Sequence, residues 1–506
     1  MYLTQSLHRA RQQHPDRIAT VYGGRERDFA THADRVARLA GGLRSLGVAP
    51  GDRIAMYALN SDRYLEYLMA VPWADAVLVP VNTRWTTAEV AGGLNDCAAR
   101  VLIVDDAFAD AVPALRNRCP GVDHVVYAGD GPVPDGCADY EALLAGSDPT
   151  PDARRGGDAL AAVFYTGGTT GEAKGVMLSH ANLLTSALGC LAAGFMATPG
   201  GRFLHVAPMF HLGDLAHWVM QSLADSTQVT VPGFDPVALL AALTEHGITD
   251  LFLVPTMLRL VFDHPDFDPA AFAAVRRLVY AASPMPPRLL DRASRVLPHV
   301  ELVQAYGMTE LSPAVTLLGP AEHDGPHRYS AGRAAAHAEV RVVAEDGTPL
   351  PVGAAGEIVC RGGHVMLGYW GRPELTAAAV RDGWMHTGDA GYLDDDGYLF
   401  VVDRIKDVII NGGENVWSGE VEDVLHEHPL VAACAVIGVP DDTYGERVHA
   451  VVVPGAAERP SVTDLDAHVR AHLAGYKAPR GYDFVDELPL SGAGKVLKHE
   501  LRAAYR

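Results

Sequence analysis

The chain has 506 residues, of which 48% are apolar, enough for a sizeable core divided over about two to four domains. Lysine and arginine number 41 and aspartate and glutamate 62, so the formal net charge is -21. This acidity argues against nucleic acid and anionic membranes as partners. The six widely spaced cysteines include no C-x-x-C pair, and no apolar run is long enough to span a bilayer. We therefore expect a cytoplasmic protein with free thiols and no integral membrane association.

The N-terminal part of the chain alternates predicted strands and helices. Thr31 is expected to cap a helix that reaches Leu46 and stops at Gly47. Downstream, apolar runs predict strands at 54–58, 77–81 and 101–104, separated by helices at 64–70 and 89–94. Such alternation is typical of an α/β layer with parallel strands.

A segment rich in glycine and threonine follows the apolar run 160–164, and Ser179 after it can cap a helix. Its glycines let backbone N–H groups approach a ligand closely, and its hydroxyl groups and Lys174 add donors and positive charge. It is not a Walker A loop, because Gly171 is followed by Glu172. We interpret it as a polyphosphate-binding loop, made of Thr166, Gly167, Gly168, Thr169, Thr170, Gly171 and Lys174.

An aromatic residue and a histidine, Phe210 and His211, precede a predicted helix that contains Asp214, His217 and Trp218. A lone histidine is more often a core or surface residue than a functional one. Asp214 and His217 are unusual polar choices here. They are either exposed or in contact with a polar part of a ligand.

Two further predicted strands run into distinctive turns. The strand at 275–282 leads into Ser283 and Pro284, and the strand at 301–304 leads into 305–310. In the second turn, Tyr306 offers an aromatic face for a purine, Thr309 a hydroxyl group, and Glu310 a carboxylate suited to Mg2+.

The C-terminal part has shorter elements, which indicate a compact α+β domain of about 100 residues. Before it, Thr387-Gly-Asp389 would by itself be read as a turn, and Asp394 to Gly397 as the turn of a hairpin. Lys495 stands on a glycine-rich turn near the end of the chain, where a lysine is usually solvated.

Taken together, these segments resemble the motifs of the adenylate-forming superfamily of acyl-CoA synthetases, peptide-synthetase adenylation domains and luciferases. The family loop reads Thr-Ser-Gly-Thr-Thr-Gly-x-Pro-Lys-Gly, and this chain has Gly167 for the serine and Ala173 for the proline. The motifs follow in family order over nearly the whole chain, most similar to fatty-acyl-CoA and related acyl-CoA ligases. The resemblance implies an α/β fold with a large N-terminal domain of several subdomains with mixed sheets and helices, 1–405, and a small mobile α+β domain, 406–506.

The resemblance also implies a role for each motif residue. Catalytic roles fall to Lys495, Thr309, Lys174 and His211. The ATP or AMP site would comprise Thr166, Gly167, Gly168, Thr169, Thr170, Gly171, Lys174, Ala282, Ser283, Pro284, Ala305, Tyr306, Gly307, Met308, Thr309, Asp389, Arg404 and Lys495. Glu310 would hold the metal, and Lys406 would be the hinge. The CoA tunnel would be formed by Gly412, Gly413, Glu414 and Tyr444, and the acyl pocket by His211, Asp214, Trp218, Ala281 and Ala282.

The implied reaction uses ATP, Mg2+ and CoA. A small carboxylic acid is activated as an acyl-adenylate with release of pyrophosphate, and the acyl group is then transferred to the CoA thiol with release of AMP. The stretches expected to form the acyl pocket contain small residues and no lysine or arginine. This favours a hydrophobic monocarboxylate, which could be fatty, polycyclic or aromatic, over a dicarboxylate.

Several alternatives stay open at this point. The acceptor could be the phosphopantetheine of a carrier protein, the fold could serve a luciferase-like oxygenase, or the chain could be a non-catalytic acyl or nucleotide sensor. Retention of the lysines, Thr309, Glu310, Asp389 and Arg404 argues against a sensor. Which acid is used, and whether the chain forms a homodimer, cannot be read from the sequence.

Overall fold

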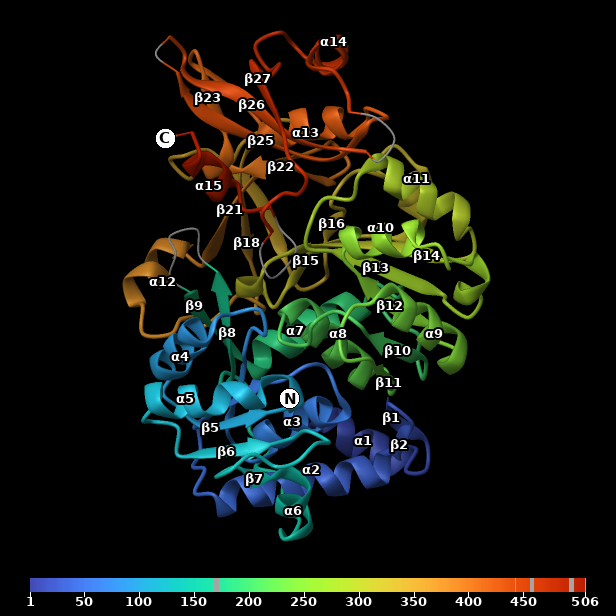
Figure 1. The fold of residues 1–506 in the computed structure, drawn as a ribbon, viewed down its shortest axis with the longest axis vertical. Coiled ribbons are helices and arrows are strands. Elements are labelled where there is room, and N and C mark those ends of the chain that lie inside the picture. Colours follow the sequence, from blue (N-terminus) through green and yellow to red (C-terminus); the bar gives the residue numbers. More distant parts are fainter. Residues whose placement is uncertain (168–172, 442, 456–458, 491–495, 506) are drawn as a thin grey trace.

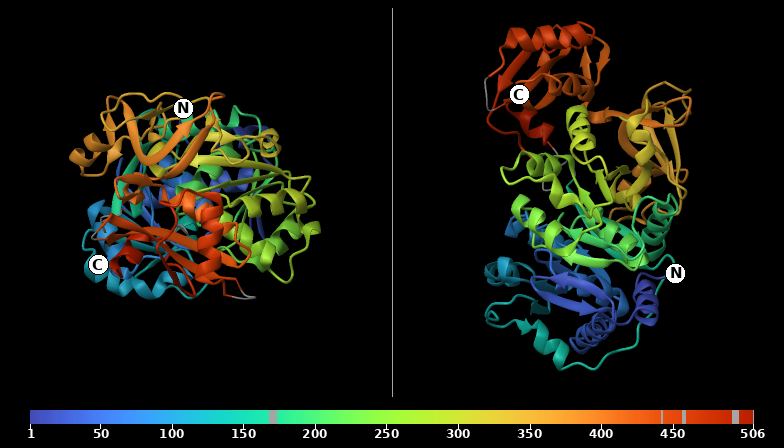
Figure 2. Two further views of the ribbon diagram at one scale, coloured as in Figure 1. Left: turned by 90° about the horizontal axis from the view of Figure 1, so that it is seen from above. Right: turned by 90° about the vertical axis from the view of Figure 1, so that its right-hand side faces the viewer.

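The computed structural model describes residues 1–167, 173–441, 443–455, 459–490 and 496–505. It is a mixed α/β protein with three sheets in a large N-terminal part and a fourth sheet in a smaller C-terminal part (Figure 1). This confirms the predicted fold class. In two perpendicular views the C-terminal part, in orange and red, stands at one end of the larger part (Figures 1 and 2).

The first sheet carries the glycine- and threonine-rich segment. In order across the sheet its strands are β19 (Gly368–Tyr369), β9 (Ala173–Ser179), β8 (Leu160–Gly167), β4 (Val77–Pro80), β3 (Arg53–Tyr57), β5 (Ala99–Val104), β6 (His124–Tyr127) and β7 (Ala138–Asp139). The strands from β8 to β7 run parallel, whereas β9 pairs antiparallel with both β8 and β19. The accompanying helices are α2 (Phe29–Ser45), α3 (Asp62–Trp73), α4 (Thr87–Asp96), η1 (Asp106–Ala111), α5 (Val112–Arg118) and α6 (Tyr140–Ala145).

The second sheet carries the expected nucleotide and acyl motifs. In order its strands are β16 (Arg333–Ala334), β15 (Ala314–Leu318), β14 (Glu301–Gly307), β13 (Arg277–Ala281), β12 (Asp250–Leu253), β10 (Arg202–His205), β11 (Thr227–Thr230), β1 (Ile18–Tyr22) and β2 (Arg25–Asp28). Strands β14 to β1 run parallel, which places their carboxyl ends along one edge. The helices are α1 (Gln5–Gln13), α7 (His180–Leu191), α8 (Leu212–Leu223), α9 (Pro236–His246), α10 (Pro255–Asp263), η2 (Pro269–Phe272), α11 (Pro287–Val296), η3 (Thr309–Leu311) and η4 (Pro320–Asp324).

Two smaller sheets complete the fold. The third is antiparallel and contains β17 (Glu339–Val343), β18 (Gly356–Arg361), β20 (Val380–Arg381), β21 (Trp384–Leu393) and β22 (Leu399–Arg404), with α12 (Pro373–Ala379) nearby. The fourth contains β23 (Ile409–Asn411), β24 (Glu414–Val416), β25 (Val431–Asp441), β26 (Gly445–Pro454) and β27 (Gly481–Phe484), with α13 (Ser418–His426), α14 (Val462–His472) and α15 (Lys498–Ala503). The short η5 (Ile405–Asp407) connects these two sheets. No helix in the described ranges has the length and apolar character needed to cross a membrane.

Local sequence signals explain most helix starts. One of the two predicted helix caps is confirmed and the other is wrong. Ser179 caps α7 as expected, since its hydroxyl group accepts a hydrogen bond from the backbone N–H of Asn182. Thr31, however, does not cap α2. The cap is Asp28, whose carboxylate accepts a hydrogen bond of 2.7 Å from the backbone N–H of Thr31. The helix therefore starts at Phe29, because the aspartate one turn earlier satisfies the free N–H groups.

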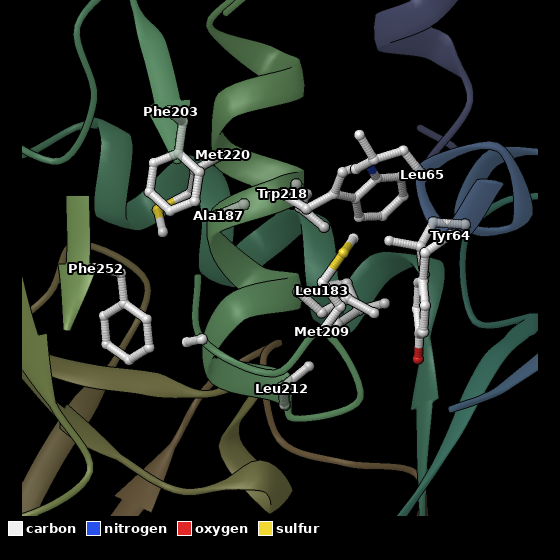
Figure 3. Packing of buried hydrophobic residues seen from close by; sticks show 14 of the residues in the cluster. Tyr64, Leu65, Leu183, Ala187, Phe203, Met209, Leu212, Trp218, Met220 and Phe252 are labelled. Atoms are coloured by element: carbon white, nitrogen blue, oxygen red, sulfur yellow. The ribbon is translucent and has the colours of Figure 1, made fainter. Parts of the chain in front are cut away.

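The core is densest around α8. Figure 3 shows Trp218 on one side of this helix, directed toward Leu65 of α3, with Phe203 and Phe252 on the other side. Trp218 is only 2% exposed and is the largest of the fully buried side chains. Its position makes it a core residue that joins α8 to α3.

We expect Trp218→Ala to lower the free energy of unfolding by about 3–5 kcal/mol, because it would leave a large cavity that the surrounding helices cannot fill. Chemical denaturation of the purified protein measures this loss. Leu260→Ala on α10 is the matched control, since Leu260 is 45% exposed and should change stability by no more than about 0.5 kcal/mol. Similar losses in the two variants would contradict the assignment of Trp218 to the core.

Candidate active site

The glycine- and threonine-rich segment joins two antiparallel strands. Thr166 near the end of β8 pairs with Lys174 near the start of β9, and Gly167 pairs with Ala173. The strand therefore continues beyond Phe164, further than its apolar run predicts. Gly168, Thr169, Thr170 and Gly171 lie outside the described residues. The hairpin places Lys174 beside the base of the segment, where a phosphate-binding lysine would be needed.

Lys174 belongs to a cluster that reaches Glu310. Its ammonium nitrogen lies 5.4 Å from the centre of the Tyr369 ring, a cation–π distance. The Tyr369 hydroxyl group donates a hydrogen bond of 2.9 Å to Glu310 Oε1. Burial and the neighbouring Glu310 carboxylate raise the pKa of Tyr369, so this hydroxyl group remains a donor. Lys174, expected to bind phosphate, and Glu310, expected to bind the metal, thus both interact with Tyr369.

Sequence reasoning missed Tyr369. Its contacts depend on the pairing of β19 with β9, in which Tyr369 lies opposite Val176. Nearly 200 residues separate these strands, and no motif marks the position. The only local signal is an aromatic pair, Tyr369 and Trp370, directly after Gly368.

A second cluster joins Tyr306, Asp389 and Arg404. The Tyr306 hydroxyl group donates a 2.7 Å hydrogen bond to Asp389 Oδ2, and Arg404 Nε lies 2.8 Å from Asp389 Oδ1. Burial and the Asp389 carboxylate raise the pKa of Tyr306. Asp389 lies on β21 opposite Arg404 on β22, so the hairpin closed at Asp394 to Gly397 positions both. Three residues expected at one nucleotide are therefore in direct contact.

Asp389→Asn is expected to raise the KM for ATP by about 10-fold to 100-fold, since a neutral amide accepts the two ribose hydroxyl groups less strongly than a carboxylate. Steady-state kinetics at saturating acid and CoA measure the change. Asp395→Asn, on the exposed turn of the same hairpin, is the control and should leave this KM unchanged. An unchanged KM in Asp389→Asn would argue against the ribose assignment.

The ends of β13 and β14 lie side by side. Ala281 pairs with Ala305, which brings Ala282, Ser283 and Pro284 next to the segment from Ala305 to Thr309. Ala282 has φ 73°, a left-handed conformation that costs a residue with a side chain about 1–3 kcal/mol and is concentrated at functional sites. Gly307 is required sterically, because a Cβ there would lie 1.8 Å from the carbonyl oxygen of Pro313. Both turns are thus tightly constrained beside Tyr306.

The residues expected in the acyl pocket do not all lie together. His211 precedes α8, with its ring 4.2 Å from that of Phe210. Asp214 is buried, and its Oδ1 lies 2.6 Å from His205 Nδ1. Trp218 points away from Phe252, toward α3 (Figure 3). The alternative that Asp214 and His217 are exposed is therefore wrong, and Trp218 is placed in the core between α8 and α3.

The expected hinge and CoA residues lie in the C-terminal part of the molecule. Lys406 is in η5, directly between the third and fourth sheets, and burial lowers its pKa. Gly412 and Gly413 have φ of 64° and 87° at the turn between β23 and β24, so the turn itself demands glycine. The Gly412 N–H donates to the carbonyl oxygen of Tyr444 (2.8 Å). Glu414, which starts β24, is exposed.

The Tyr444 ring is covered in this structure by the guanidinium group of Arg480, 3.9 Å from the ring centre. Packing against Arg480 therefore explains an aromatic side chain at position 444 even if it contacts no ligand. The same contact places the Arg480 cation beside the turn between β23 and β24. Lys495 lies outside the described residues, between Leu490 and Val496, which form an isolated β-bridge.

Comparisons with known proteins agree with one another. The model of the AMP-binding enzyme family matches residues 7–370, and that of the AMP-binding enzyme C-terminal domain matches 420–495. The chain is 42% identical to feruloyl-CoA synthase of an Amycolatopsis species, over 99% of this chain and 98% of that protein. It is 36% identical to the fatty acid–[acyl-carrier-protein] ligase ScoC of Streptomyces coeruleorubidus, over 99% and 96%. Its fold superimposes on ATP-bound MatB from Rhodopseudomonas palustris with a TM-score of 0.90 at 31% identity, over 100% and 99% of the two chains.

Proposed function

This chain belongs to the AMP-binding enzyme family and is an ATP-dependent acyl-CoA ligase, and we propose that its acid is a hydrophobic aromatic monocarboxylate. The similarity to feruloyl-CoA synthase over the whole chain carries this proposal. The segments 212–220, 281–284 and 305–310 contain no lysine or arginine to pair with a second carboxylate. Ala281 and Ala282 have small side chains, which suits a flat aromatic group.

In the first half-reaction, a carboxylate oxygen attacks the α-phosphorus of ATP, and pyrophosphate leaves. Negative charge then accumulates between two anionic reactants, so the reaction needs preorganised cations and N–H groups. We assign this role to Lys174 beside the phosphate segment and to Lys495. Thr309 would donate its hydroxyl group to the α-phosphate, and Asp389 would accept hydrogen bonds from the ribose.

The Glu310 carboxylate is suited to Mg2+. It is 7% exposed and is held by the Tyr369 hydroxyl group, 2.9 Å away. In the part of the chain that the structure describes, no cluster of three or more histidine, cysteine, aspartate or glutamate residues could hold a metal. A single protein carboxylate fits Mg2+, which keeps several waters and binds substrate phosphates. The ion, when bound, would neutralise phosphate charge.

In the second half-reaction the CoA thiol attacks the carbonyl carbon of the acyl-adenylate, and AMP leaves. We propose that the C-terminal domain turns about Lys406 between the two half-reactions. Lys406 suits this role because η5 is the only covalent link between the third and fourth sheets. Gly412, Gly413, Glu414 and Tyr444 would then border the path of the pantetheine arm, and Arg480 would add positive charge for the CoA phosphates.

A carrier-protein acceptor is the second candidate, since ScoC is similar over nearly the full length of both chains. The experiment that tests the proposal is product analysis with ATP and a panel of aromatic, fatty and dicarboxylic acids, each supplied with CoA or with a phosphopantetheine-bearing carrier protein. Aromatic acids with CoA should give the highest turnover. Turnover confined to fatty acids, or to the carrier protein, would overturn the corresponding part of the proposal.

We also propose that the enzyme works in the cytoplasm. All six cysteines are free, and five of them are buried. Burial raises the pKa of Cys190 and of Cys360 to about 12, so these two remain unreactive thiols. Free thiols are typical of proteins in a reducing compartment.

A further inference from the structure

His217 on α8 is held between two aromatic rings. Its ring stacks on Phe203, with centres 5.4 Å apart and planes inclined by 13°, and on Phe252, with centres 4.6 Å apart and planes inclined by 21°. These contacts fix the plane of the imidazole. The positions of Phe203 and Phe252 beside α8 are visible in Figure 3.

The hydrogen bond of the ring defines which nitrogen carries the proton. His217 Nδ1 lies 2.9 Å from the carbonyl oxygen of Gly213, and a carbonyl oxygen can only accept, so Nδ1 donates. Burial lowers the pKa of His217, which keeps the ring neutral. Nε2 is then an acceptor with a free lone pair. It is buried and has no hydrogen-bond partner among the residues that the structure describes.

The location of His217 relates it to the expected acyl site. His211 precedes α8 at the carboxyl edge of the second sheet, and His217 follows six residues later, about 9 Å along the helix axis. Gly213 lies one turn before His217 and also faces the Phe252 ring, because a Cβ at Gly213 would lie 3.3 Å from that ring. Phe252 pairs with Val279 on β13, two residues before Ala281. His217 therefore lies deeper than Ala281, beyond Gly213 and Phe252.

We propose that His217 Nε2 accepts a hydrogen bond from a hydroxyl group at the far end of the acid, and so selects aromatic acids with a ring hydroxyl group. This inference rests on the proposed function, since it places the carboxylate near His211. The distance along α8 is comparable to the length of a para-substituted arylpropenoate. A neutral acceptor between aromatic rings favours a neutral donor, because a second carboxylate offers Nε2 no proton and would be buried beside the Asp214 carboxylate. The Phe252 ring turns aside as the hydroxyl group enters, a side-chain adjustment common on binding.

The test compares kcat/KM for 4-hydroxycinnamate, cinnamate and 4-methoxycinnamate. The wild-type enzyme should prefer the hydroxylated acid over the other two by about 10-fold to 100-fold, since only this acid satisfies the buried acceptor. His217→Phe keeps an aromatic ring between Phe203 and Phe252 and should reduce the preference to within about threefold. His217→Gln, which retains an acceptor, should keep part of it.

His472→Phe is the matched control. His472 makes the same hydrogen bond to the carbonyl oxygen four residues earlier (2.8 Å to His468), but it is exposed on α14. Its substitution should leave the preference unchanged. Equal wild-type activity toward the three acids would overturn the role of His217 alone, and this result does not depend on any variant folding. Activity toward none of them, with turnover of other acids, would overturn the aromatic substrate class as well.

Discussion

Lys495→Ala is expected to slow acyl-adenylate formation by roughly a factor of hundreds, the usual loss when one stabiliser of transition-state charge is removed. We propose, from the resemblance to adenylate-forming enzymes, that this lysine contacts the carboxylate and the α-phosphate during the first half-reaction only. Thioester formation from a supplied acyl-adenylate should therefore stay near the wild-type rate. Pyrophosphate release measures the first half-reaction, and acyl-CoA formed from synthetic acyl-adenylate measures the second.

Lys477→Ala is the control for this experiment. Lys477 belongs to the same domain, but its ammonium group is paired with Glu420, 2.6 Å away. Its loss should leave both half-reactions close to the wild-type rates. If Lys495→Ala slowed both half-reactions equally, the lysine would not be specific to adenylation, and the proposed movement about Lys406 would lose its main support.

Glu310→Gln should also slow adenylation by roughly a factor of hundreds, because the amide keeps the shape of the side chain but removes the charge that attracts Mg2+. The Tyr369 hydroxyl group can still donate to the amide oxygen, so the fold should be retained. The variant should need more Mg2+ to reach half-maximal rate. Pyrophosphate release over a Mg2+ titration measures this shift, and calorimetry with ATP at fixed Mg2+ gives a readout independent of turnover.

Tyr369→Phe separates the charge of Glu310 from its orientation. This variant removes only the 2.9 Å hydrogen bond to Glu310, which is worth about 1.5–3 kcal/mol when one partner is charged, and so should slow adenylation by about 10-fold to 150-fold. An unchanged Mg2+ dependence in Glu310→Gln would contradict the metal assignment.

The elements and motifs predicted from sequence are those with local causes. The apolar run 160–164 and the Ser179 cap predict the position of β8 and the start of α7 to within a few residues. In these two cases residue chemistry and spacing along the chain contain the information. The contact of Tyr306 with Asp389 could be expected only from the resemblance, which implies a role at one nucleotide for both residues.

The parts that could not be predicted depend on distant pairing. Tyr369 reaches Glu310 only because β19 joins β9, and no periodicity marks a strand of two residues. The sequence does not distinguish whether Trp218 lines a pocket or lies in the core, since the direction of its side chain depends on how α8 packs against α3. The unpaired nitrogen of His217 appears only when the positions of Gly213, Phe203 and Phe252 are known together.

The most direct test of the central claim is to measure pyrophosphate, AMP and acyl-CoA together in reactions with ATP, Mg2+ and each acid of a broad panel that includes 4-hydroxycinnamate, with and without CoA. An acyl-CoA ligase should release pyrophosphate and AMP in equal amounts when CoA is present, with one acyl-CoA formed per AMP. Without CoA, pyrophosphate release should stop after about one turnover, because the acyl-adenylate stays bound. ATP binding without pyrophosphate release across a broad panel of acids would contradict the claim and indicate a nucleotide sensor.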